Sequence, residues 1–270
     1  MKTYPRVLTI AGSDSGGGAG IQADIKAISA TGSYAMSAIT AVTVQNTLGV
    51  LDVHPVPVDI LRAQITCVLS DIGADAIKIG MLHSAEVVKA VRSSLEPFDS
   101  RNIVLDPVMV STSGHRLIEE SAIETLKSIL IPNARVITPN IPEAEVLLEA
   151  KISSREDLPK AARELSFGGK VSVLMKAGHL SDDLLTDWFY NAETDTLTPL
   201  SGERTETQNT HGTGCTISSA LASYLAQGQG LDEAVRNAKA YISEAIRSGA
   251  LYSIGHGHGP VDHFWKSRTQ

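Results

Sequence analysis

Cysteine is scarce in this chain, and long apolar runs and basic segments are missing. Cys67 and Cys215 are the two cysteines among 270 residues. They could form at most one disulfide, which favours a reduced cytoplasm over an oxidising compartment. No apolar run reaches the roughly 20 residues that a membrane-spanning helix needs. The run from Val7 to Ala11 is too short for a signal peptide. We therefore expect a cytoplasmic protein without a membrane partner.

Positive charge is also limited. The chain has 23 Lys and Arg against 30 Asp and Glu, a net charge of -7 and a pI of about 5.6. Nucleic acids and anionic membranes bind positive surfaces, so we expect neither as a partner. An anionic substrate would need a local positive site made of backbone amides, lysine or a metal ion.

Apolar strand-like runs alternate with helix-period segments along most of the chain. Strands are expected at 6–11, 34–44, 76–79, 103–105, 135–138 and 171–175, and the segment 187–200 indicates an antiparallel hairpin. Helices are expected at 20–31, 58–70, 84–95, 119–130, from Pro142 onward, 154–167, 215–226 and 231–248. This alternation indicates a mainly parallel sheet covered on both faces. No linker, repeat or low-complexity tract interrupts it, so we expect one α/β domain over residues 1–270.

Polar residues follow six of the expected strands directly. Ligands of such sheets bind at the carboxyl ends of the strands, so residues in register there predict one site. The residues in question are Gly12 to Ser15, Gln45 to Thr47, Gly80 and Met81, Asp106 and Pro107, Asn140 and Glu143, and Lys176 to Gly178.

The segment Thr210 to Thr216, with sequence Thr-His-Gly-Thr-Gly-Cys-Thr, precedes an apolar helical segment. Backbone amides at a helix start bind phosphate or a developing oxyanion. A thiol at this position is expected to have a lowered pKa, which predicts a reactive Cys215. The same spacing is also typical of an ordinary glycine-rich turn before a packed helix, capped by Thr210 or Thr213.

Two common nucleotide-binding patterns do not fit. The spacing Gly18-x-Gly20-x-x-Ala23 matches a dinucleotide fingerprint, but the second strand ends in Val44, Gln45 and Asn46 instead of an acidic residue. A Walker P-loop would need Ser or Thr after Gly169-Lys170, and valine follows. A phosphotransferase would therefore have to hold its phosphates in another way.

Five motifs in order carry a family resemblance: 11–24, 37–47, 106–110, 138–140 with Glu143, and 211–216. Together they resemble the hydroxymethylpyrimidine/phosphomethylpyrimidine kinases of thiamine biosynthesis, within the ribokinase superfamily. The resemblance runs from Val7 to Trp265. It implies a ribokinase-like three-layer sandwich, a homodimer, and transfer of phosphate from ATP to 4-amino-5-hydroxymethyl-2-methylpyrimidine and then to its monophosphate.

The resemblance also implies site residues. The substrate side comprises Gln45, Asp24, Gly12, Met81 and Val108. Lys176 and Thr213 are implied in ATP binding, and Asp106 and Glu143 in Mg²⁺ binding. Catalysis is implied for Cys215 with the amides of Gly212, Thr213 and Gly214. One departure concerns 111–115, Ser-Thr-Ser-Gly-His, where the family commonly has Lys and then Ser-Gly-Asp. It puts in doubt any charged contact from Thr112 or His115.

Each assignment has a simpler structural alternative. Gln45 can match an aminopyrimidine edge, or it can tie down a loop. Asp24 can face the substrate or complement a helix dipole. Glu143 can bind a cation or cap a helix, and Lys176 can neutralise a phosphate or face solvent. The histidines of 255–260 have metal-like spacing, although a glycine-rich surface turn fits them better.

Two other functions are compatible with these motifs. Pyridoxal kinase is the nearest, because relatives share the cysteine-containing loop and some act on both rings. A non-catalytic pyrimidine sensor on the same fold is the second. The presence of Asp106, Glu143, Lys176 and Cys215 argues against a sensor, which has no need for groups that bind metal and γ-phosphate.

Overall fold

A nine-stranded sheet forms the centre of the computed structural model, which describes residues 3–110, 117–178 and 184–268. The strands lie in the order β3-β2-β1-β4-β5-β6-β7-β8-β9. They are β1 (Arg6–Asp14), β2 (Tyr34–Asn46), β3 (Gly49–Pro55), β4 (Ala76–Ile79), β5 (Ile103–Leu105), β6 (Val136–Ile137), β7 (Ser172–Met175), β8 (Leu184–Asn191) and β9 (Thr196–Glu203). Pairing is parallel from β2 to β7 and antiparallel for β2–β3, β7–β8 and β8–β9. The mainly parallel sheet and the hairpin are both confirmed.

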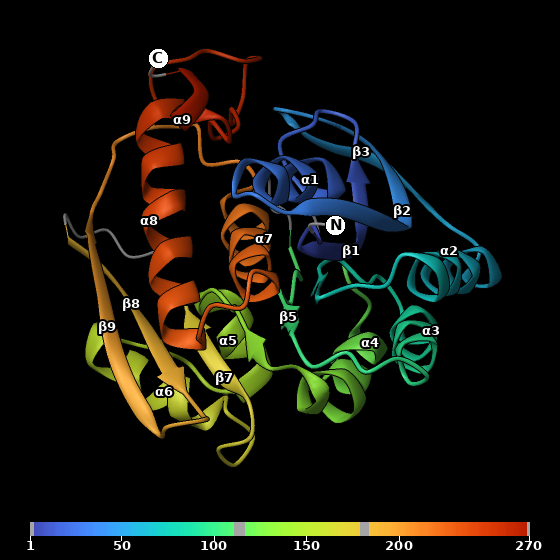
Figure 1. Cartoon of the computed structure of the whole chain (residues 1–270). Coiled ribbons are helices and arrows are strands. Elements are labelled where there is room, and N and C mark those ends of the chain that lie inside the picture. The colour runs from blue at the N-terminus through green and yellow to red at the C-terminus, as the bar shows by residue number, and fades with distance from the viewer. Residues whose placement is uncertain (1–2, 111–116, 179–183, 269–270) are drawn as a thin grey trace.

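Helices cover both faces of this sheet (Figure 1). They are α1 (Gly20–Ala30), α2 (Val58–Asp71), α3 (Ala85–Leu95), α4 (Glu120–Thr125), α5 (Ile141–Leu148), α6 (Leu158–Glu164), α7 (Thr213–Ala226), α8 (Leu231–Gly249) and α9 (Trp265–Arg268). Successive strand residues point to opposite faces. Val7 and Val104 therefore pack with α1, α7 and α8, whereas Leu8 and Leu105 pack with α2 to α6. The result is the expected three-layer sandwich.

Some elements differ from the sequence prediction. The sequence does not predict β3, because most of its side chains are exposed and show no apolar period; Leu51 is 74% exposed. The expected helix at 119–130 is α4 followed by π-helical Leu126–Leu130 and 3₁₀-helical Ile131–Asn133. Pro132 lies in that last turn and cannot continue an α-helix. Helix α7 starts at Thr213, two residues before the predicted start.

The order of the strands places a crevice beside β1. The chain passes from β1 to β2 on one side and later returns to β4 on the other side of β1. Ligands bind at such a switch point. Gly12 lies there: a Cβ at this position would be 2.8 Å from the Cε of Met81. Strand β1 and the loop after β4 can therefore approach each other closely.

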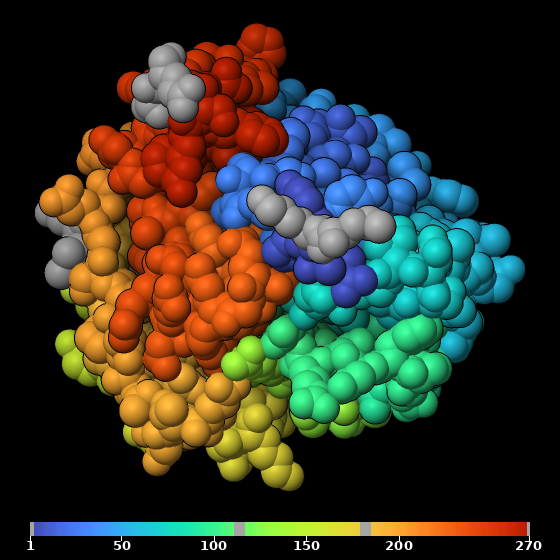
Figure 2. Space-filling model, in the orientation of Figure 1, coloured from blue at the N-terminus to red at the C-terminus, as the bar shows by residue number. Residues whose placement is uncertain are grey.

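A segment near the C-terminus also packs against the N-terminal part of the fold. Figure 2 shows red C-terminal residues beside blue N-terminal ones, and the backbone N–H of His258 donates to the Thr47 carbonyl. Within the described ranges, no helix combines the length and apolar character needed to cross a membrane.

Candidate active site

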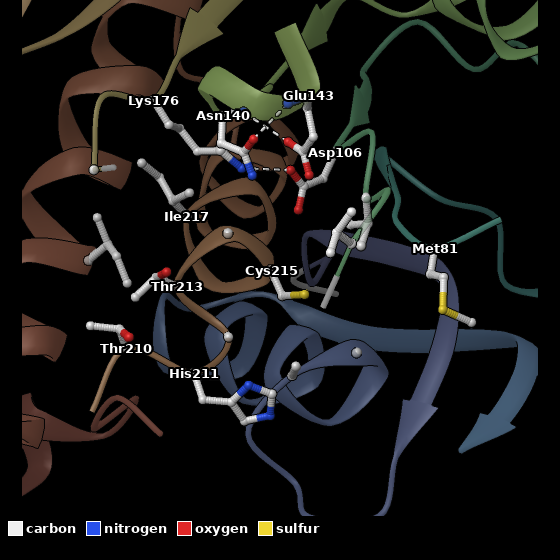
Figure 3. Close-up of a pocket in the computed structure, with 18 of the residues that line it drawn as sticks. Met81, Asp106, Asn140, Glu143, Lys176, Thr210, His211, Thr213, Cys215 and Ile217 are labelled. Carbon is white, nitrogen blue, oxygen red and sulfur yellow. Dashed lines mark hydrogen bonds and ion pairs between the residues drawn. The ribbon is translucent and has the colours of Figure 1, made fainter. Parts of the chain in front are cut away.

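A cavity of about 710 Å³ opens at the carboxyl ends of the parallel strands. It brings together residues from all six predicted strand ends with the segment that leads into α7. Figure 3 shows part of this set, including Met81, Asp106 and Lys176. Of the residues predicted for the site, those that line the cavity are Gly12, Gln45, Met81, Asp106, Val108, Glu143, Lys176, Gly212, Thr213, Gly214 and Cys215.

Asp106 and Lys176 form an ion pair in the middle of this cavity. Asp106 follows β5 and Lys176 follows β7. The Lys176 ammonium donates to Asp106 Oδ1 at 2.9 Å, and the Thr138 hydroxyl donates to the same oxygen at 2.9 Å. Burial alone would raise the pKa of Asp106, but the charges of Lys176 and Lys78 hold it below its usual value. Asp106 is therefore ionised at neutral pH.

Glu143 lies in the first turn of α5, and its carboxylate caps that helix. The backbone N–H of Asn140 donates to Glu143 Oε2 at 2.8 Å, and Asn140 Oδ1 accepts from the Glu143 N–H at 2.9 Å. The capping alternative is thus realised, yet the carboxylate also lines the cavity. Burial, with repulsion from Asp106, raises the pKa of Glu143 to about 7, although Lys176 opposes this rise.

These two carboxylates fit a divalent cation that arrives with a phosphate ligand. Mg²⁺ is usually held by one or two carboxylates together with substrate phosphates and several waters. Repulsion between Asp106 and Glu143 is part of what raises the pKa of Glu143, and a cation between them would relieve it. Across the described part of the chain, no three His, Cys, Asp or Glu side chains are grouped as a metal site.

Glycine geometry brings the start of α7 to this ion pair. Gly212 precedes the helix with φ 77°, and a Cβ there would overlap the Gly18 carbonyl oxygen, so only glycine fits. A Cβ on Gly214 would lie 3.1 Å from Lys176 Nζ and 3.4 Å from Asp106 Oδ2. The first turn of α7, whose N-terminus favours anions, thus lies directly beside Lys176.

The predicted low pKa of Cys215 is wrong. The thiol lies in the first turn of α7 and lines the cavity. Burial raises its pKa to about 11, and the nearby charge of Lys78 only partly opposes this effect. Desolvation outweighs the charge of Lys78 and the hydrogen bond from the Gly20 backbone, so the group is a thiol at neutral pH.

Gln45 lies at the end of β2, next to a histidine that sequence reasoning did not single out. Its Nε2 is 3.4 Å from His211 Nε2, and the Thr43 hydroxyl donates to its Oε1 at 3.1 Å. His211 Nε2 lies 2.9 Å from Asp14 Oδ2. Asp14 also accepts hydrogen bonds from the backbone of the glycine loop at Gly16, Gly18 and Ala19. This pairing joins the loop after β1 to the loop before α7.

Asp24 does not line the cavity, which corrects its assignment to the substrate side. It is fully buried and forms an ion pair with Lys78 Nζ at 2.8 Å. Its oxygens also accept from Thr9 Oγ1 at 2.6 Å and from Ser219 Oγ at 2.7 Å. It also lies beyond the first turn of α1, so it does not serve the dipole there. Asp24 instead ties β1, β4 and α7 together beneath the site.

The cavity continues past the ion pair to the other edge of the sheet. Strands β8 and β9 and helix α8 line this second part, and Asp187 is buried there. Asp187 accepts from the Ala177 N–H at 2.7 Å and from Lys239 Nζ at 2.7 Å. The cavity therefore has two lobes, with the start of α7 and Lys176 between them.

The segment 111–115, where the sequence differs from the family pattern, lies outside the described residues, and so do its members Thr112 and His115.

Comparisons with known proteins agree with this architecture. A family model described as phosphomethylpyrimidine kinase matches residues 14–262. The hydroxymethylpyrimidine/phosphomethylpyrimidine kinase of Haemophilus influenzae is 45% identical over 271 residues, covering 99% of this chain and 100% of that protein. The thiamine biosynthesis bifunctional protein ThiED of Geobacter sulfurreducens is 48% identical over 262 residues, 96% of this chain; the match spans about half of that longer protein, 53%.

A solved structure has the same fold. Pyridoxal kinase from Staphylococcus aureus, in complex with AMP-PCP and pyridoxal, superposes with a TM-score of 0.88 at 37% identity. The match covers 98% of this chain and 96% of that one. The family model covers most of the chain and the Haemophilus relative nearly all of it. The chain belongs to the phosphomethylpyrimidine kinase family.

Proposed function

We propose that this protein transfers the γ-phosphoryl group of ATP to 4-amino-5-hydroxymethyl-2-methylpyrimidine, and then to the monophosphate so formed, in thiamine biosynthesis. The observation that carries the proposal is the position of the α7 first turn beside Lys176, between two lobes of one cavity. Phosphoryl transfer depends mainly on positioning and charge stabilisation, and this junction supplies both. The activities for which the Haemophilus and Geobacter relatives are named support the choice of substrate.

The lobe at β1, β2 and β4 suits the pyrimidine. Gln45 offers an amide that can donate to and accept from the edge of an aminopyrimidine. Gly12 leaves room beside Met81, and Val108 adds an apolar wall. The lobe at β8, β9 and α8 suits the nucleotide, with its γ-phosphate directed toward Thr213 and Lys176.

The reacting groups meet at the start of α7. The N–H groups of Gly214 and Cys215 and the ammonium of Lys176 stabilise negative charge on the transferred phosphoryl group. The thiolate form of Cys215, a minor species at neutral pH, takes the proton of the hydroxymethyl group and becomes a thiol. Asp106 and Glu143 would hold Mg²⁺, which neutralises charge on the ATP phosphates when it is bound.

Turnover with three acceptors tests this function. Purified protein with ATP and Mg²⁺ is given the pyrimidine alcohol, its monophosphate or pyridoxal, and ADP release is followed. The proposal predicts turnover with both pyrimidines. Turnover with pyridoxal alone would make the protein a pyridoxal kinase, the alternative that the Staphylococcus aureus structure favours. Pyrimidine binding without turnover would make it a sensor.

We further propose that the protein acts in the cytoplasm as a homodimer, without nucleic-acid or membrane partners. The family resemblance supports the dimer, and the net charge of -7 supports the lack of anionic partners. Analytical ultracentrifugation measures the assembly: a mass near 57 kDa, twice the 28.6 kDa of one chain, is expected, and a single-chain mass would contradict it.

A further inference from the structure

The segment 255–260, Gly-His-Gly-His-Gly-Pro, lies beside the site and has no part in the function proposed above. We call it the strap. It forms the surface turn expected from its sequence, and the side chains of His256 and His258 are exposed. Its described neighbours form no metal cluster with them. Most of its close contacts are made by backbone and glycine, and the His258 ring adds one, with its Nδ1 3.3 Å from the Gln208 carbonyl oxygen.

One end of the strap is bound to the turn between β2 and β3. The Thr47 carbonyl accepts from the His258 N–H at 2.9 Å. The Thr47 hydroxyl oxygen accepts from the N–H groups of His256 at 3.2 Å and Gly257 at 3.3 Å. Thr47 lies two residues after Gln45, so the strap holds the strand end that carries the proposed substrate-selecting amide.

The other end of the strap is bound to the loop that leads into α7. The Gly259 carbonyl accepts from the His211 N–H at 3.0 Å, and Pro260 forms a parallel bridge with His211. The His211 ring lies 3.4 Å from the amide nitrogen of Gln45. Contacts therefore run in a closed ring from Gln45 through Thr47, the strap and His211 back to Gln45.

The glycines of the strap are required by these contacts. A Cβ at Gly257 would overlap the Thr47 carbonyl oxygen, and one at Gly255 would overlap the Thr47 side chain. A Cβ at Gly259 would overlap the side chain of Asn209, which precedes the α7 loop. Gly257 thus faces the turn that follows β2, whereas Gly259 faces Asn209, just before the loop that leads into α7.

We propose that the strap is a positioning element that sets Gln45 of β2 against the His211 loop and the first turn of α7. This inference rests on the proposed function. It implies that two glycines in one short segment control different kinetic constants, because each contacts a different part of the site.

Kinetics of two glycine variants test the proposal. Gly257→Ala should raise KM for the pyrimidine alcohol about tenfold and change kcat less than about threefold, since a small displacement of Gln45 weakens substrate binding. Gly259→Ala should lower kcat about tenfold and change KM less than about threefold. Gly230→Ala is the matched control, because its φ is -63° and no atom lies within 4 Å of its Cβ.

A second pair of variants, at Thr47, tests the same contact in case the glycine variants do not fold. Thr47→Val keeps the shape of the side chain and removes the oxygen that accepts from His256 and Gly257. Thr47→Ser keeps that oxygen. Valine should raise KM for the pyrimidine several-fold, and serine should restore the wild-type value.

Hydrogen–deuterium exchange gives a readout that does not depend on turnover. In Gly257→Ala and Thr47→Val, exchange should become faster both at 44–48 and at 208–214. The strap proposal is overturned if exchange at 208–214 is unchanged in these variants, or if folded Gly257→Ala and Gly259→Ala alter the same kinetic constant equally or alter neither. A wild-type protein that phosphorylates no acceptor would instead refute the proposed function, and exchange would still decide the role of the strap.

Discussion

The ammonium of Lys176 lies 2.9 Å from Asp106 Oδ1 at the point where α7 begins. Burial lowers the pKa of Lys176, but the charges of Asp106 and Glu143 and the hydrogen bond to Asp106 together more than reverse this effect, so Lys176 and Asp106 are both ionised. A phosphate that approaches Lys176 therefore meets a cation already neutralised by a carboxylate. A second cation between Asp106 and Glu143 would take over the charge of Asp106, and the Lys176 ammonium could then bind the phosphate.

Asp106→Asn should increase the Mg²⁺ concentration needed for half-maximal turnover by about tenfold or more, because it removes one charged ligand. Binding of the pyrimidine without nucleotide, measured by isothermal titration calorimetry, should stay near wild type. Asp75→Asn is a matched control, since Asp75 is a carboxylate paired with a basic side chain, that of Arg6, and does not line the cavity. Loss of pyrimidine binding in Asp106→Asn would contradict this prediction and would show that Asp106 binds the pyrimidine.

Gln45→Glu should lower kcat/KM for the pyrimidine alcohol by about one to two decades. The change keeps the size and an acceptor but removes the N–H that faces the ring, and an unmatched buried polar partner costs about 1–3 kcal/mol. It also places a carboxylate near the Asp14–His211 pair. Steady-state kinetics measure the loss, with KM for ATP as the internal control. Unchanged pyrimidine kinetics would remove Gln45 from the site.

Cys215→Ala should slow phosphorylation of the alcohol at least about tenfold more than phosphorylation of the monophosphate. The alcohol must lose a proton during transfer, whereas a phosphomonoester is already largely anionic at neutral pH. Single-turnover rates of both steps measure the difference, and Cys67→Ala is the control at the exposed cysteine. Equal losses in the two steps would show that the thiol positions ATP. If neither step is slowed, Cys215 contributes only its backbone N–H, which alanine keeps.

The raised pKa of Cys215 adds a dependence on pH. Below a pKa of about 11 the thiolate fraction grows about tenfold for each pH unit. Alcohol phosphorylation by the wild type should therefore rise between about pH 7 and pH 9, and this rise should be absent in Cys215→Ala. A flat wild-type profile for the chemical step would contradict base catalysis by this thiol.

Asp24→Asn should lower the free energy of unfolding by about 3–5 kcal/mol, because it leaves the Lys78 ammonium buried without its counter-charge. Urea unfolding measures this loss. Adding Lys78→Met to Asp24→Asn should recover part of it, since the double variant buries no charge there. If Asp24→Asn has normal stability and a raised KM for the pyrimidine, Asp24 acts in substrate binding and this prediction is wrong.

The parts of the site that the sequence predicted are those encoded locally. Asp106 and Lys176 follow β5 and β7 directly, Gly12 and Gln45 lie near the carboxyl ends of β1 and β2, and strand ends of a parallel sheet meet at one edge. The start of α7 was predicted for a similar reason, because glycines before an apolar helical segment leave few other conformations.

The remaining features depend on tertiary contacts. Lys78 within a short apolar strand has no pattern that marks it, and only the fold brings it to Asp24. His211 and the strap act through residues more than 150 positions away in the sequence, at Gln45 and Thr47. The predicted low pKa of Cys215 is wrong because burial, which the sequence does not give at one residue, raises the pKa more than the charge of Lys78 lowers it.

The most direct measurement follows the products of one reaction by ³¹P NMR. Wild-type protein, ATP and Mg²⁺ are mixed with the pyrimidine alcohol alone. The account predicts that a phosphomonoester resonance appears first and then gives way to the two resonances of a pyrimidine diphosphate, while ADP accumulates. A spectrum in which only the ATP resonances persist, in a sample that phosphorylates pyridoxal, would contradict the account.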